Sequence, residues 1–214
     1  FLSRPRRFGK SLFLSTLAAY FEGKKELFNG LFLEHGEIEL AEEEGREAWV
    51  AYPVLRIDLN AKNYISEEKL VEKLDVQLEL LEKKYHVEQT KEALEDRFFN
   101  LIESTYQATG RQVVLLIDEY DKPLYESLED SELNSVYRGV LRGFYSVIKS
   151  QDAYIRFAFL TGITKFSKVS IFSDLNNLYD ISFTSEYSTL CGITQEELER
   201  NFSVEIEQIA KAYG

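Results

Sequence analysis

The run Val113–Ile117 constrains the fold most, because five successive apolar residues are followed at once by the acidic stretch 118–121, Asp-Glu-Tyr-Asp. A strand that is apolar at every position is typical of one covered on both faces. Such strands belong to parallel sheets that carry helices on each side. The run therefore predicts an α/β protein in which Asp118 and Glu119 lie at the carboxyl end of a central strand.

The rest of the chain alternates between strand and helix patterns, as expected of a parallel sheet with helical crossovers. We expect further strands at residues 1–3, 54–59, 155–160 and 179–183. Apolar spacing and N-cap residues predict helices over residues 10–21, from Ser66 to 81, from Thr90 to a stop at Gly110, over 136–148 and from Thr194 onward. The acidic stretch 34–50 is only weakly patterned and is expected to be an exposed excursion. The fold class is a three-layer α/β/α domain with a mainly parallel sheet of about five strands.

Composition excludes several classes of protein and site. Lys and Arg number 25 against 37 Asp and Glu, and this net charge of −12 makes direct nucleic-acid binding an unfavourable expectation. One Cys excludes an internal disulfide or a Cys-based zinc site, and two His disfavour a histidine-rich metal centre. The longest apolar run is too short to span a membrane, so a cytoplasmic protein is expected. Met is absent even from position 1, which suggests an internal part of a longer chain with a truncated first strand.

The tripeptide Gly9-Lys10-Ser11 lies between a predicted strand end and a predicted helix start, the context of a Walker A loop. Backbone N–H groups at a helix N-terminus bind phosphate. The Lys10 ammonium can reach the outer phosphates, and the Ser11 hydroxyl can ligate Mg²⁺. The tripeptide alone is common, so it indicates a nucleotide site only together with the residues around it.

The residues before this tripeptide depart from the full Walker pattern, because Arg4 occupies the position where a Gly is expected. Arg4, Arg6, Arg7 and Lys10 form the densest basic cluster of an acidic chain. A solvated turn or a nucleic-acid patch would explain the cluster, but its ending in Gly-Lys-Ser favours nucleotide phosphates. The predicted nucleotide-binding residues, called the phosphate loop below, are Arg4, Pro5, Arg6, Arg7, Phe8, Gly9, Lys10, Ser11 and Leu12.

The carboxylates after the apolar run have the chemistry that phosphoryl transfer needs. Ligands bind at the carboxyl edge of open parallel sheets. Asp118 would hold Mg²⁺, mostly through water, and Glu119 would orient and polarise the attacking water. An ordinary strand ending in a polar turn is the alternative, and the presence of both motifs in one chain favours the nucleotide site.

A third predicted strand ends near Thr161 and Thr164, and either hydroxyl could contact the γ-phosphate or the attacking water. Thr161 is the first choice. The predicted catalytic residues are therefore Lys10, Glu119 and Thr161. A plain strand-to-loop turn at Gly162 explains the same residues equally well. Lys165 and Lys168 could approach phosphate from the following loop. Arg138 or Arg142 could act in trans as an arginine finger, although solvated or salt-bridged arginines are the more ordinary interpretation.

Four segments together resemble the bacterial AAA-ATPase-like family, namely residues 1–12, 19–28, 116–124 and 159–167. The resemblance runs over essentially the whole sequence, and Arg-Pro-Arg-Arg-Phe-Gly-Lys-Ser is the family's own form of the phosphate loop. It implies a P-loop NTPase of the additional-strand, catalytic-glutamate kind. Many members carry a PD-(D/E)XK nuclease-like domain on the C-terminal side, and none fits within the residues after 191.

The expected organisation is an ATPase-like domain over 1–190 and the start of a helical extension over 191–214. The expected function is binding of ATP with Mg²⁺-dependent hydrolysis. ATP is favoured over GTP because no Asn-Lys-x-Asp guanine-binding motif is present. Two alternatives stay open: a nucleotide-gated switch or scaffold without significant hydrolysis, and a regulatory ATPase module of a nuclease. A homo-oligomer is compatible with either.

Overall fold

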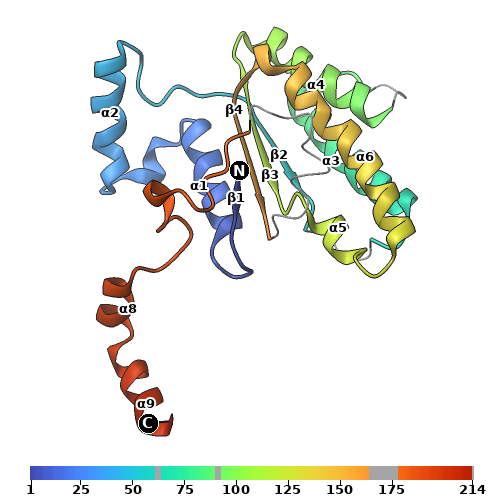
Figure 1. The fold of residues 1–214 in the computed structure, drawn as a ribbon. Coiled ribbons are helices and arrows are strands. Elements are labelled where there is room, and N and C mark those ends of the chain that lie inside the picture. The colour runs from blue at the N-terminus through green and yellow to red at the C-terminus, as the bar shows by residue number, and fades with distance from the viewer. Residues whose placement is uncertain (61–63, 90–92, 164–177, 214) are drawn as a thin grey trace.

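The computed structural model describes residues 1–60, 64–89, 93–163 and 178–213. Within them lies one sheet of four parallel strands in the order β1-β4-β3-β2 (Figure 1). The strands are β1 (Leu2–Ser3), β2 (Val54–Asp58), β3 (Val113–Asp118) and β4 (Ile155–Gly162). The α/β class is thus confirmed, and β4, the last of the described strands, lies between β1 and β3.

The prediction of a strand over 179–183 is wrong, because no strand forms there. The segment nevertheless lies beside β1: the Phe1 amino group donates to the Tyr179 carbonyl at 2.5 Å, and the Ile181 amide donates to the Phe1 carbonyl at 3.1 Å. The Ser182 amide then turns away to the Asp180 carboxylate at 3.0 Å. Since β1 is two residues long, it offers too few backbone partners to extend this pairing into a strand.

Helices cover both faces of the sheet, which gives the expected three layers (Figure 1). The described helices are α1 (Lys10–Phe21), η1 (Lys25–Phe28), α2 (Phe32–Glu44), α3 (Glu67–Tyr85), α4 (Leu94–Thr109), α5 (Lys122–Glu126), α6 (Ser131–Ser150), η2 (Asp152–Tyr154), η3 (Ser185–Tyr187), α8 (Gln195–Asn201) and α9 (Ser203–Tyr213). Helices α3, α4 and α6 pack on one face and α1 on the other. Helices α8 and α9 extend away from the sheet and bury none of their residues.

Strand β3 shows why the sheet needs both layers. Alternate side chains of a strand point to opposite faces. Val113, Leu115 and Ile117 contact the core beneath α3, α4 and α6, whereas Val114 and Leu116 contact the core beneath α1. The apolar run therefore fills two cores at once.

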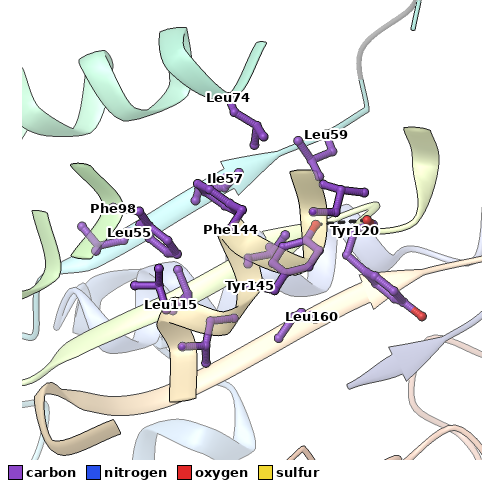
Figure 2. Packing of buried hydrophobic residues seen from close by; sticks show 14 of the residues in the cluster. Leu55, Ile57, Leu59, Leu74, Phe98, Leu115, Tyr120, Phe144, Tyr145 and Leu160 are labelled. Carbon is purple, nitrogen blue, oxygen red and sulfur yellow. Dashed lines mark hydrogen bonds between the residues drawn. The ribbon is translucent and has the colours of Figure 1, made fainter. Parts of the chain in front are cut away.

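Aromatic rings pack among the more numerous aliphatic side chains of the larger core (Figure 2). The rings of Phe98 and Phe144 stack with their centroids 4.5 Å apart, which joins α4 to α6. The Tyr145 hydroxyl donates to the Tyr120 carbonyl at 3.0 Å, drawn as a dashed line in Figure 2. This hydrogen bond connects α6 to the turn that follows β3.

The stretch 34–50 is largely exposed, as expected, but most of it forms the helix α2, which its weak pattern did not predict. Most of its acidic residues lie on the exposed face, which weakened the apolar pattern, but Glu37 is buried. Its carboxylate accepts hydrogen bonds from Arg46, from the Tyr20 hydroxyl at 2.5 Å and from the Trp49 amide at 3.1 Å. Burial acts to raise the pKa of Glu37, and these donors hold it below its usual value.

The predicted helix starts fare differently. Thr194 caps α8 through a reciprocal capping box with Glu197, as predicted. Ser66 precedes α3 but makes no side-chain capping bond. Thr90 lies outside the described residues, and α4 begins at Leu94. Gly110 ends α4 in the left-handed conformation, with φ of 65°.

Among the described residues, no helix has the length and apolar character needed to cross a membrane.

Candidate functional site

Main-chain hydrogen bonds at the carboxyl edge of the sheet bring the predicted motifs together. The Arg4 amide donates to the Gly162 carbonyl at 3.2 Å, which joins the phosphate loop to the end of β4. The Tyr120 amide donates to the Thr161 carbonyl at 2.9 Å, which joins β4 to the turn after β3. Three segments far apart in the sequence therefore converge on one edge.

The phosphate loop enters α1 through a left-handed turn. Gly9 is the N-cap residue with φ of 83°, a conformation that a side chain would strain. Lys10 opens the helix and is only 4% exposed. Its ammonium donates to the Arg4 and Pro5 carbonyls at 3.1 and 3.3 Å. The loop thus folds around the Lys10 ammonium.

Glu119 forms an ion pair with the same ammonium, at 3.3 Å between Lys10 Nζ and Glu119 Oε1. Its backbone has φ of 53°, unusual for a residue other than glycine. Burial raises the pKa of the Glu119 carboxyl above its usual value, and the attraction of Lys10 offsets this only in part. The carboxylate is thus held in a site that favours taking up a proton.

Two carboxylate oxygens at this edge have unmet hydrogen-bonding capacity. Asp118 is fully buried, and its Oδ1 accepts a hydrogen bond from the Thr161 hydroxyl at 2.6 Å. Asp118 Oδ2 and Glu119 Oε2 are buried without a hydrogen-bond partner among the described residues. Buried oxygens of this kind are costly unless a cation, a water molecule or a ligand satisfies them.

Glu119 and Lys10 border a cavity of about 520 Å³, whereas the fully buried Asp118 does not line it. Its lining is formed by Arg6, Arg7, Gly9, Lys10, Ser11, Leu12, Asn60, Glu119 and Lys122. Four basic side chains face one carboxylate, so the cavity attracts anions even though the whole chain is acidic.

Several predicted residues lie elsewhere. The Arg4 guanidinium donates to four carbonyls, including those of Ser182, Tyr187 and Leu190, so it holds the segment 182–190 against β1. The side chains of Pro5 and Phe8 do not line the cavity. Arg4 and Pro5 contribute their carbonyls, as bond acceptors for Lys10.

The other predicted site residues lie in different environments. Thr161 is fully buried with its hydroxyl on Asp118, and Ser11 lines the cavity from the first turn of α1. Arg138 donates to Asn134 at 2.8 Å within α6. Thr164, Lys165 and Lys168 lie outside the described residues. Among those that are described, no group of three or more His, Cys, Asp or Glu side chains could hold a metal ion.

The sequence reasoning missed a support formed by Asp121 and Gly162. The Asp121 carboxylate is buried and accepts the Ile163 amide at 3.1–3.2 Å. A Cβ at Gly162 would lie 2.5 Å from the Tyr120 ring and 2.6 Å from the Asp121 carboxylate. The end of β4 therefore needs glycine to approach the turn after β3. The second Asp of the acidic stretch 118–121 was the available signal.

A second cavity of about 490 Å³ is lined mainly by apolar side chains of α1, β4 and residues 178–190. None of the predicted site residues lines it. The chemistry therefore points to the cavity at the carboxyl edge.

Comparison with known proteins places the chain in a family. The family model described as a predicted AAA-ATPase matches residues 1–172. The chain belongs to this AAA-ATPase-like family. The match includes the phosphate loop, the β3 carboxylates and the end of β4.

A curated relative of this AAA-ATPase-like chain is an uncharacterized protein in the vnfD 5' region of Azotobacter chroococcum mcd 1. The two sequences are 44% identical over 207 residues, which cover 96% of this chain and 38% of the relative. The chain therefore spans about two fifths of the length of that protein. No solved structure matches the chain.

Proposed function

We propose that this domain binds ATP at the carboxyl-edge cavity and hydrolyses it with Mg²⁺, as one part of a longer protein. The observation that carries the proposal is that the consecutive residues Asp118 and Glu119 each keep a buried oxygen without a partner, while the other Glu119 oxygen pairs with the buried Lys10 ammonium. A cation-bound phosphate chain and a water molecule would satisfy all three groups.

The sheet order supports the assignment to the additional-strand, catalytic-glutamate class of P-loop NTPases. Strand β4 separates the strand that leads into the phosphate loop from the strand that carries Asp118 and Glu119. We further propose that residues 1–190 form the nucleotide domain and that 191–214 begin a helical extension.

In the proposed reaction, Lys10 leaves Glu119 and binds the outer phosphate oxygens. The Ser11 hydroxyl and the Asp118 carboxylate would hold Mg²⁺, which neutralises phosphate charge when bound. Asp118 fits this role because Thr161 occupies one of its oxygens and orients the other. Thr161 is therefore proposed as a positioning residue for Asp118, in place of direct contact with phosphate.

Glu119, released from Lys10, would orient a water molecule and take its proton as the water oxygen attacks the γ-phosphorus. The bond from the γ-phosphorus to the bridging oxygen breaks as the new one forms. The raised pKa of Glu119 suits a proton acceptor, because it brings the carboxyl nearer to the pH at which it operates.

A switch that binds ATP without turnover is the second candidate, and one observation favours it. Lys10 and Glu119 neutralise each other in the structure. If nucleotide binding does not separate them, Glu119 cannot serve the attacking water. The two candidates share the binding step and differ in turnover.

Thermal unfolding with and without Mg·ATP tests the shared step. A ligand at 100 times its Kd stabilises the folded state by about 2.7 kcal/mol. We expect this shift in the parent protein and its loss in Lys10→Ala. Lys83→Ala removes an exposed lysine paired with Glu79 on α3 and serves as the matched control. A folded parent that shows no shift, or a Lys10→Ala protein that keeps it, would refute the proposed site.

A further inference from the structure

Helix α5 brings a lysine into the cavity that the proposed reaction does not use. Lys122 is the first residue of α5, and its amide donates to the Glu119 carbonyl at 2.9 Å. Its side chain is 13% exposed and lines the same cavity as Lys10 and Ser11. The turn after β3 therefore delivers a carboxylate and an ammonium to one site, three residues apart.

The partner of Lys122 within α5 is one that an anion can displace. Lys122 Nζ lies 2.8 Å from Glu126 Oε1, in a pair four residues apart whose carboxylate side chain is 27% exposed. Partly solvated pairs of this kind contribute little stability. The order of Lys before Glu is also the weaker orientation for a helical pair. Glu126 thus holds Lys122 in place without binding it strongly.

The phosphate loop contacts the same helix. The Arg6 guanidinium lies over the Tyr125 ring, 5.1 Å from its centroid. Arg6 also lines the cavity, so this cation–π contact ties the loop to α5 across it. Movement of the loop onto a ligand would carry α5 and Lys122 with it.

We infer that Lys122 is a second phosphate-binding cation, directed at the terminal phosphate of the nucleotide. The inference rests on the proposed function and goes beyond the Gly-Lys-Ser motif. When Lys10 turns to the phosphates, Glu119 loses its cation and would repel the terminal phosphate. Lys122, on the same wall of the cavity, offsets that repulsion. Because it follows Glu119 so closely, it acts on the γ-phosphate and not on the β-phosphate.

Calorimetric titration of Lys122→Ala with Mg·ATP and with Mg·ADP tests the inference. A charge-assisted bond to phosphate predicts about tenfold weaker binding of Mg·ATP. Binding of Mg·ADP should change by less than about twofold. Lys83→Ala, which breaks an exposed lysine–glutamate pair outside the cavity, should match the parent for both ligands. Lys122→Gln replaces Lys122→Ala if the alanine protein unfolds.

Glu126→Gln separates phosphate binding from a structural role of the Lys122–Glu126 pair. If Lys122 binds phosphate, removing its competitor leaves Mg·ATP binding unchanged or tighter. If the pair only stabilises α5, Glu126→Gln weakens binding as Lys122→Ala does, and the inference is wrong.

Failure of the inference is distinguishable from failure of the proposed function. Parent binding that is lost in Lys10→Ala but kept in Lys122→Ala overturns the role of Lys122 alone. No binding by the parent, or equal binding by Lys10→Ala, overturns both.

Discussion

Two buried ion pairs in this domain look alike in composition and differ in how completely they are satisfied. Arg97 of α4 binds both oxygens of Glu82 on α3, with Nε–Oε1 at 3.0 Å and Nη2–Oε2 at 2.7 Å. Lys10 reaches one oxygen of Glu119 at 3.3 Å, and the other oxygen has no partner among the described residues. All four side chains are at most 11% exposed.

We interpret the first pair as structural and the second as part of the proposed nucleotide site. A bidentate arginine–carboxylate pair gives each carboxylate oxygen a donor and here joins two helices. A lysine that holds half of a carboxylate leaves an oxygen that must be satisfied by something else. The complete pair lies within the helical layer, whereas the incomplete one lies at the edge of the sheet, where a cavity admits a ligand.

Substitution of the incomplete pair should have the largest effect, and on turnover. Glu119→Gln keeps the shape of the side chain and removes the proton acceptor. We expect hydrolysis to fall by about 10²–10⁴-fold, while Mg·ATP binding remains. Glu79→Gln, on the exposed surface of α3, is the matched control and should retain parent turnover in a steady-state phosphate-release assay.

The pH profile of turnover checks the same assignment. A protonated Glu119 cannot accept a proton, and burial raises its pKa above the ordinary value of 4.5. Turnover should therefore decline with falling pH while the pH is still above 4.5, and this limb should be absent from any residual activity of Glu119→Gln. Turnover that stays constant down to about pH 4.5 would contradict the assignment, as would full activity of Glu119→Gln.

Removing the cation from each pair should have unequal effects on stability. Arg97→Met leaves Glu82 buried without its partner, and we expect a loss of about 3–5 kcal/mol in urea denaturation. Lys10→Met should cost about 1 kcal/mol or less, because Lys10 contacts only one oxygen of Glu119, at 3.3 Å, and this carboxylate lines a cavity. Equal losses in the two proteins would refute the distinction between a complete and an incomplete pair.

A smaller effect is expected where a threonine completes a carboxylate. Thr161→Val removes the donor to Asp118 Oδ1 and should cost about 1–3 kcal/mol of stability. Thr105 on α4 is the matched control, since it is equally buried and its hydroxyl has no partner among the described residues. Thr105→Val should leave the free energy of unfolding unchanged or raise it, because it removes a buried hydroxyl that lacks a partner. A neutral Thr161→Val would mean that Asp118 does not need this donor.

Local patterns were sufficient for much of the fold. Helix α1 spans Lys10–Phe21 as predicted, because its apolar spacing is regular. Strand β3 extends the prediction by one residue, to Asp118. Helix α2 was not predicted, because the many acidic residues of this stretch obscure its apolar pattern. Its buried carboxylate, Glu37, depends on hydrogen bonds from Arg46, Tyr20 and Trp49, which no local pattern indicates.

The sequence predicted some of the residues that line the carboxyl-edge cavity and missed others. Lys10, Ser11, Asp118 and Glu119 could be proposed because motif spacing reflects the strand-to-helix turns that bear them. Lys122 was overlooked, since nothing in its local sequence says that α5 folds back to the phosphate loop. Asn60 lines the cavity from the end of β2 and was overlooked for the same reason.

By itself, the sequence determined the α/β class, the position of the phosphate loop and the carboxylates that follow the central strand. Those properties follow from periodicity and short motifs, which act over a few residues. Only the tertiary structure decided that β4 lies between β1 and β3, that Arg4 holds residues 182–190, and that Glu119 is half satisfied while Glu82 is complete. Each of these depends on partners far away in the chain, and hydrogen bonds of that range have no local signature.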